Sequence, residues 1–258
     1  LETQAKALRA QAQTITDPTT IAKLTAGAAQ AEAGANAMRK QQGEVQDKHL
    51  ESTQTGWGVT PIIGVDVKLG KWNLASKFEF NTHLNIQNDT KRDDTGMFKH
   101  GVNTPNDIPA LLTLGAQYEI TPEVRVMTGW HHYFDKSAKM ANDKQKLLKG
   151  DTNEFLFGAE WDVTDKILVS AGTQLTRYGL GNGAYLNDMS FVTSSYSIGF
   201  GAKFQVAKNM HVNVAYFWTN YEKFNKTTEA ALGAAQVVNT DEFTRTNKVF
   251  GVGLDITF

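Results

Sequence analysis

The sequence predicts an all-β fold: about nine strands of a larger transmembrane, antiparallel, up-and-down β-barrel, preceded by an N-terminal external helical segment. From Trp57 onward, apolar and polar residues alternate in nine runs, each roughly 10–13 residues long. Strands of soluble proteins are about 5–6 residues long, whereas tilted strands that cross a membrane need about 9–11. The segments between the runs alternate between short and long, which is typical of outer-membrane barrels.

Composition excludes several classes of protein. The 258 residues carry a net charge of −1, so the chain lacks the basic surface of a nucleic-acid-binding protein. It has no cysteine, which removes zinc fingers, iron–sulfur clusters, disulfide scaffolds and thiol catalysis. The mean hydropathy of −0.37 is typical of a soluble protein, but alternation along barrel strands gives the same low average. We expect no metal and no cofactor.

The first 50 residues are rich in Ala, Gln, Lys and Glu and contain no aromatic residue. Asp17 followed by Pro18 indicates a helix start, because Asp is a good N-cap and Pro suits the first helical position. Helices are therefore expected at about 3–13 and 18–47, with only a thin apolar stripe. The expected division of the chain is an external helical segment at 1–56 and barrel strands with their connections at 57–258.

Each expected strand has an apolar face and a polar face. In the first, Val65 and Val67 share one face, whereas Asp66 and Lys68 share the other. The nine strands are expected at 57–69, 72–82, 110–120, 124–135, 154–163, 167–178, 196–206, 211–221 and 249–258.

The connections indicate the direction of the strands. Outer-membrane barrels have short periplasmic turns and longer external loops. The last strand, which ends at Phe258, would therefore run toward the periplasm, and the helical segment would lie outside the cell. The short connections are 70–71, 121–123, 164–166 and 207–209, and the long ones are 83–108, 136–152, 179–195 and 222–247.

Nine strands do not close a barrel. Single-chain bacterial barrels have an even number of strands, and an open edge in lipid leaves backbone groups unpaired at several kcal/mol each. We therefore expect this chain to be the C-terminal part of a larger barrel, with the other strands on an N-terminal part that is separate or cleaved.

Charged residues lie on the polar faces, toward the periplasmic half. The lumen-lining candidates are Lys68, Lys77, Glu79, Arg125, Glu160 and Lys203. They are expected mainly to form ion pairs in a polar lumen, since a wide barrel fills its interior with polar groups or water. The alternative is that they contact a plug or line a polar path for a ligand.

A histidine pair near the end of the fourth strand is the strongest catalytic candidate. His131 and His132 point to opposite faces of a strand and cannot hold one metal ion together. His131, Tyr133 and Asp135 share the polar face near the external rim. We expect rim polarity rather than catalysis, so the chain is not predicted to be an enzyme.

Two stretches carry a resemblance to a known family. TGWGVTPIIGVDVKLGKWNLASKFEF (55–80) and IPALLTLGAQYEITPEVRVMTGWHHYF (108–134) resemble the FadL-like outer-membrane transport proteins, which carry long-chain fatty acids and other hydrophobic compounds. The resemblance implies a barrel of about fourteen strands, of which these nine are the last. It also implies that the helical segment corresponds to the long external loop between the fifth and sixth strands.

The same resemblance implies where a ligand is first captured. In such a protein the external helices and the loop at 83–108 would form a groove, and Met and Phe adapt to varied apolar ligands. The alternative is that these side chains only pack helix against loop. The ligand-binding candidates are Ile21, Leu24, Met38, Leu50, Met97 and Phe98.

The function implied is a bacterial outer-membrane channel for passive uptake of hydrophobic small molecules, such as long-chain fatty acids. Its partners would be membrane lipid, the hydrophobic ligand and the missing N-terminal part of the barrel. One alternative is a non-transport barrel that serves as a scaffold or accessory for surface-protein export or assembly, with an outer-membrane protein as partner. Another is a barrel enzyme with His131 and Asp135 in its site.

Overall fold

The structure is a computed structural model that describes residues 1–44, 46–187, 191–232 and 235–257. The chain divides into two compact units. The first comprises Leu1–Thr53 and Asp89–His100, and the second comprises Gln54–Asn88 and Gly101–Phe258. Among the described residues, no helix has the length and apolar character needed to cross a membrane.

The first unit contains a pair of helices, α1 (Glu2–Thr14) and α2 (Pro18–Glu44). The side chain of Asp17 accepts a hydrogen bond of 2.9 Å from the N–H of Thr20, which confirms the predicted start of α2. Small residues form the contact between the helices and allow a close approach: Ala5, Ala28, Ala31 and Ala35 are buried. The predicted helices are confirmed, although α2 ends before the expected residue 47. Leu50 begins a strand, β1 (Leu50–Thr55), in a region where the sequence pattern predicts no strand.

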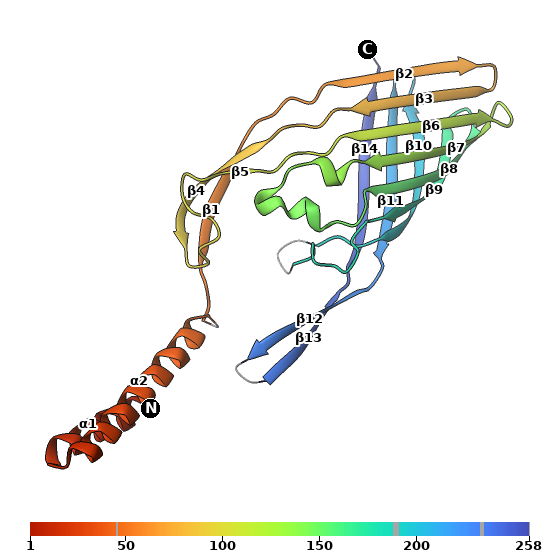
Figure 1. The fold of residues 1–258 in the computed structure, drawn as a ribbon. Helices are drawn as coiled ribbons and strands as arrows, with labels where there is room; N and C mark the ends of the chain where they lie inside the picture. Colours follow the sequence, from red (N-terminus) through yellow and green to blue (C-terminus); the bar gives the residue numbers. More distant parts are fainter. Residues whose placement is uncertain (45, 188–190, 233–234, 258) are drawn as a thin grey trace. The chain divides into compact units, whose positions relative to one another are not determined.

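The second unit is built on a nine-stranded antiparallel sheet in the order β14-β11-β10-β9-β8-β7-β6-β3-β2 (Figure 1). Neighbours in this sheet follow one another along the chain, so the topology is up-and-down, as predicted. Within the described residues, β2 and β14 are the unpaired edges. The strands are β2 (Ile62–Leu69), β3 (Trp72–Glu79), β6 (Leu111–Glu119), β7 (Val124–Tyr133), β8 (Thr152–Thr164), β9 (Ile167–Arg177), β10 (Ser195–Ala207), β11 (Met210–Tyr221) and β14 (Thr246–Ile256).

The register gives the sheet two distinct faces. Residues paired directly across antiparallel strands share a face. Arg125 pairs with Glu160, and Glu160 pairs with Ser170, so the predicted polar sides of the strands fall on one surface, here called the polar face. The opposite, apolar face exposes large side chains: Phe200 is 59% exposed and Phe250 is 70% exposed.

All four predicted short connections are turns at one end of the sheet. Leu69 pairs with Trp72 across a two-residue turn in which Gly70 has a φ of +58°, a conformation that favours glycine. The aromatic rings of Trp72 and Tyr118 pack beside this turn with centroids 4.6 Å apart. The alternation of short and long connections is therefore confirmed.

Two of the long connections are more regular than predicted. The segment expected as a loop at 83–108 contains β4 (Asn85–Asp93) and β5 (Asn103–Pro105), which belong to a sheet of order β1-β4-β5. The segment at 222–247 contains a hairpin of β12 (Phe224–Leu232) and β13 (Ala235–Phe243). These strands lack a clean alternation of apolar and polar residues, so the sequence pattern does not reveal them. The connection between β7 and β8 holds two 3₁₀ helices, η1 (Asp135–Ser137) and η2 (Ala141–Leu147).

Strand ends differ modestly from the prediction. The first strand of the sheet begins at Ile62 rather than at 57, and Pro61, which has no N–H to donate, precedes it. The last strand begins at Thr246 rather than 249, and Phe258, expected at its end, lies outside the described residues.

Candidate functional site

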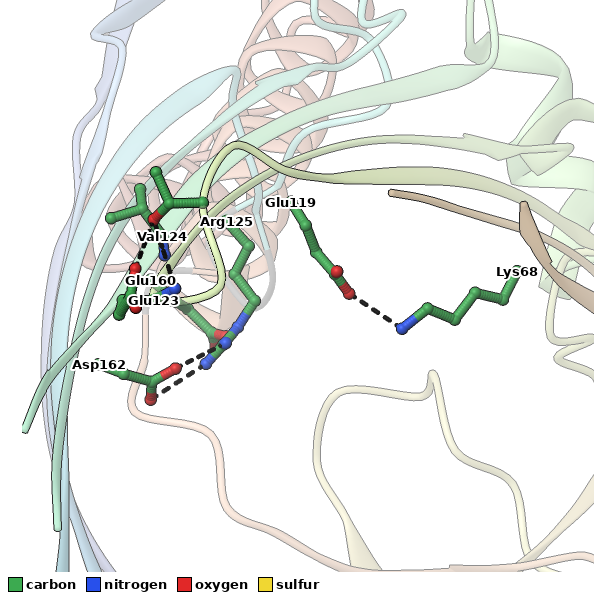
Figure 2. Close-up of polar contacts among 8 residues, drawn as sticks. Lys68, Glu119, Glu123, Val124, Arg125, Glu160 and Asp162 are labelled. Carbon is green, nitrogen blue, oxygen red and sulfur yellow. Dashed lines mark hydrogen bonds and ion pairs between the residues drawn. The ribbon is translucent and has the colours of Figure 1, made fainter. Parts of the chain in front are cut away.

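Near the short turns, the polar face carries a cluster of ion pairs. The guanidinium of Arg125 donates to Glu160 at 2.7 Å and to Asp162 at 2.8 Å (Figure 2). Backbone N–H of Val124 donates to the carbonyl and hydroxyl oxygens of Thr121, which closes the turn immediately before Arg125. The turn and the register of β7 against β8 thus position this cluster.

The other predicted lumen-lining cations also have carboxylate partners. Lys68 lies 3.0 Å from Glu119, and Figure 2 shows both extending to the same side of the sheet as Arg125. Lys77 lies 2.6 Å from Glu79 on the same strand. Lys203 is 3.8 Å from Asp255. The structure therefore places all six candidates on the polar face and pairs each cation, although Glu119, Asp162 and Asp255 are needed to complete the pairs.

Farther from the short turns, the polar face is hollowed by a depression of about 530 Å³. Its floor is backbone, because Gly158, Gly172 and Gly199 pair in a row across three strands. A Cβ atom at Gly172 would lie 3.1 Å from the carbonyl oxygen of Phe157, so a side chain there would crowd the sheet. Bulky side chains lining the depression are mostly apolar: Met127, Leu156 and Phe217.

The alternation of apolar and polar residues does not reveal this depression. The available signal was glycine recurring on the polar side of several expected strands, at 129, 158, 172, 199 and 201. Glycine has no side chain to suggest chemistry, and only the register shows that these positions adjoin.

Beyond the depression, Glu154 organises a polar cluster. Its carboxylate accepts hydrogen bonds from Gln174 at 2.9 Å, Thr176 at 3.1 Å and the hydroxyl of Tyr133 at 3.2 Å. One of its oxygens lies 3.0 Å from Nδ1 of His131. The side chain of Glu154 is only 13% exposed, so these partners offset the cost of burying a carboxylate.

The side chains of the catalytic alternative, His131 and Asp135, make separate contacts. His131 contacts Glu154, whereas Asp135 accepts a 2.9 Å hydrogen bond from the N–H of Thr152. His132 pairs with Asn153 at 2.9 Å. In the part of the chain that the structure describes, no group of His, Asp and Glu side chains is arranged to hold a metal ion.

The long connections are tied together by Asp107, whose side chain is 5% exposed. Burial acts to raise the pKa of Asp107. The hydrogen bonds that the carboxylate accepts outweigh burial, so its pKa is lowered. The donors are the N–H groups of Leu84 and Lys139 and the side chains of Asn81 and His83. Asp107 is therefore held as a carboxylate between two connections.

The ligand-binding candidates all belong to the first unit. Ile21, Leu24 and Met38 lie on α2, and Leu50 begins β1. Met97 and Phe98 follow β4 in a turn held by Asp93, whose carboxylate accepts the N–H of Phe98 at 2.8 Å. Met38 and Met97 are 63% and 64% exposed. None of the six is among the residues that line the depression on the polar face.

No family model matches this chain, and no curated protein sequence matches it. Solved structures do. A Pseudomonas aeruginosa FadL homologue is similar with a TM-score of 0.59 and 15% identity, over 76% of this chain and 51% of the homologue. The P. putida toluene transporter TodX is similar with a TM-score of 0.50 and 13% identity, over 79% of this chain and 50% of TodX.

This chain thus spans about half the length of the solved structures it matches. Identities this low show the fold alone. The predicted all-β, up-and-down barrel class is confirmed, as is the resemblance to the FadL-like family at the level of fold. The chain has the fold of about half of the FadL homologue and of TodX.

Proposed function

We propose that this chain is part of a wall of a bacterial outer-membrane channel that passively admits hydrophobic small molecules. The observation that carries the proposal is the division of one sheet into two faces. The apolar face exposes large side chains such as Phe157, Phe200 and Phe250, which suit lipid tails. The polar face carries paired charges and the apolar depression, which suit a lumen that a hydrophobic molecule crosses.

In this proposal the edges β2 and β14 pair with strands outside this chain, since unpaired backbone groups are costly in lipid. Those strands belong to the N-terminal part of the same barrel. No covalent chemistry is required, because passage depends only on binding and release.

The polar-face residues have a structural part in the proposal. Glu119, Asp162 and Asp255 complete the ion pairs of the residues that line the lumen in this proposal. These lumen-lining residues are Lys68, Lys77, Glu79, Arg125, Glu160 and Lys203. Ile21, Leu24, Met38, Leu50, Met97 and Phe98 belong to an external capture surface. Long-chain fatty acids are one class of ligand that such a surface would accept.

The test is flux into lipid vesicles that carry the whole barrel, this chain together with the N-terminal strands that complete it. Labelled hydrophobic compounds, including a long-chain fatty acid, should enter faster than they enter empty vesicles. Gly158→Trp fills the depression and should reduce the rate. Phe155→Trp, on the apolar face of the same strand and not among the residues that line the depression, should leave the rate unchanged. Equal rates with and without the protein would refute uptake, and co-purification of a stoichiometric partner would then favour the scaffold function.

A further inference from the structure

A second, smaller cavity lies among the long connections, at the end of the sheet opposite the short turns. Its volume is about 150 Å³. Three connections form its walls: those between β3 and β6, between β7 and β8, and between β9 and β10. The cavity adjoins the polar face, because Thr152 lines it and lies on the same side of β8 as Glu154 and Leu156. The apolar residues of its lining are Pro109, Ala138, Leu148, Leu180 and Val192.

Backbone hydrogen bonds join the three connections around the cavity. The N–H of Lys149 donates to the carbonyl of Gly179 at 2.7 Å, and the N–H of Asp107 donates to the carbonyl of Lys139 at 2.8 Å. The cavity is therefore formed before a ligand arrives. A preformed cavity avoids the ordering cost that a flexible one would impose on binding.

The charged groups of the lining are all negative. Asp107 and Asp135 line the cavity, and in the described part of the chain no lysine, arginine or histidine does so. Burial opposes the charge of Asp107, but the hydrogen bonds that it accepts outweigh burial and lower its pKa. Burial raises the pKa of Asp135, and the carboxylate of Asp151 adds to this effect. A positively charged ligand would supply the charge that the lining lacks.

The lining suits an alkylated cation better than a metal ion. Mg²⁺ and Ca²⁺ take about six or more oxygen ligands, whereas half of this lining is apolar. The carboxylate of Asp107 already accepts hydrogen bonds from four donors, so it offers a ligand its charge rather than free lone pairs. A quaternary ammonium group has no N–H to donate, and its methyl groups can pack against the apolar walls.

Two aromatic rings complete the lining, those of Tyr178 and Tyr185. A cation over the face of such a ring is attracted by it, and rings of this kind recognise quaternary ammonium groups. Lys144 lies over the ring of Tyr185, with its Nζ 4.5 Å from the centroid, although Lys144 does not line the cavity. The size also fits, because an apolar protein cavity of about 150 Å³ binds benzene and tetramethylammonium has one fewer non-hydrogen atom.

We propose that this cavity, here called the rim cavity, is a binding site for a small, soluble quaternary ammonium compound. Asp107 and Asp135 supply the negative charge. Tyr178 and Tyr185 supply the ring faces. The ligand comes from water rather than from lipid, because the rim cavity adjoins the polar face and lipid covers the apolar face; this placement of lipid rests on the proposed function. The site itself goes beyond the uptake of hydrophobic molecules, since its ligand carries a charge.

The test is isothermal titration calorimetry of the whole barrel in lipid nanodiscs with tetramethylammonium chloride, at constant ionic strength and with empty nanodiscs as the background. The neutral molecule tert-butanol, which has the same number of non-hydrogen atoms, should bind at least ~10-fold more weakly. Asp135→Asn keeps an oxygen that can accept the N–H of Thr152 but removes the charge, and should weaken tetramethylammonium binding at least ~10-fold. The matched control, Asp143→Asn, removes an exposed carboxylate from the same connection outside the rim cavity and should change the affinity less than ~2-fold.

A gain of binding separates loss of the site from loss of folding. Lys144→Met removes the cation over the ring of Tyr185 and should tighten tetramethylammonium binding at least ~2-fold, with tert-butanol unaffected. Equal binding of tetramethylammonium and tert-butanol, or unchanged tetramethylammonium binding in Asp135→Asn, would overturn the proposal. Saturable tetramethylammonium binding without flux of hydrophobic compounds into vesicles would refute the proposed uptake but keep the site. Flux without tetramethylammonium binding would refute the site but keep the uptake.

Discussion

Arg125 should stabilise the sheet more than any exposed ion pair does. It makes two short hydrogen bonds to carboxylates, at 2.7 and 2.8 Å. Charge-assisted hydrogen bonds contribute about 1.5–3 kcal/mol each when water is excluded. The side chains of Arg125, Glu160 and Asp162 are 21%, 32% and 36% exposed, so solvent screens part of this. We expect Arg125→Met to lower the free energy of unfolding by about 1–2 kcal/mol, partly because two carboxylates lose their cation.

The matched control is Lys68→Met. Lys68 and Glu119 are 66% and 36% exposed, so removing this pair should cost less than about 0.5 kcal/mol. The assay is urea unfolding of the protein in lipid vesicles, followed by tryptophan fluorescence. A double-mutant cycle with Glu160→Gln should show coupling of about 1 kcal/mol. If Arg125→Met shifts the midpoint no more than Lys68→Met, or if the coupling is zero, the account of this cluster is wrong.

Three further predictions concern other parts of the chain. Glu154→Leu leaves four polar side chains without their shared acceptor and should lower the free energy of unfolding by about 3–5 kcal/mol. Glu154→Gln should cost about half as much in the same unfolding assay. Equal costs would contradict the hydrogen bonds described for this cluster. Because the pKa of Asp107 is lowered in the folded protein, its carboxylate stabilises the fold at pH values above about 3.9, the pKa of an unfolded Asp. This contribution is lost as the pH falls through the folded pKa, so Asp107→Asn should flatten the acid side of a plot of unfolding free energy against pH. An unchanged plot would contradict this account of Asp107. Gly179→Ala should disrupt the contact with Gly150 and lower the midpoint of thermal unfolding. Gly251→Ala, which has open space around its Cβ position, should leave the midpoint unchanged. Similar midpoints for the two variants would show that the contact between Gly179 and Gly150 does not require glycine.

The nine strands could be predicted because the membrane and the lumen impose opposite demands on alternate residues. Phe157 and Gly158 illustrate this: neighbours in sequence fall on opposite faces, and the pattern repeats for the length of β8. The strands outside the nine-stranded sheet, such as β4, show no such alternation. In β4, the sequence NIQNDTKRD has little apolar character on either side, so pairing is visible only in the structure.

The polar-face candidates could be predicted by residue type but not by partnership. Alternation placed Arg125 and Glu160 on one face, and the register then paired them directly. Glu154 was not singled out, because its partners His131 and Gln174 lie on two other strands and adjoin it only once both registers are known. A small cavity lined by Pro109, Leu148 and Leu180 lies among three connections whose courses the sequence pattern does not determine.

The most direct test of the division into two faces uses the absence of cysteine from the chain. Single cysteines would be placed at two adjacent pairs, Leu114 with Gly115 and Phe157 with Gly158, and the protein would be inserted into lipid vesicles. Labels at 114 and 157 should be quenched by nitroxide-bearing lipid tails. Cysteines at 115 and 158 should instead react with a water-soluble maleimide and escape lipid quenching. If both members of a pair respond alike, the sheet does not separate lipid from a lumen, and the proposed channel is contradicted.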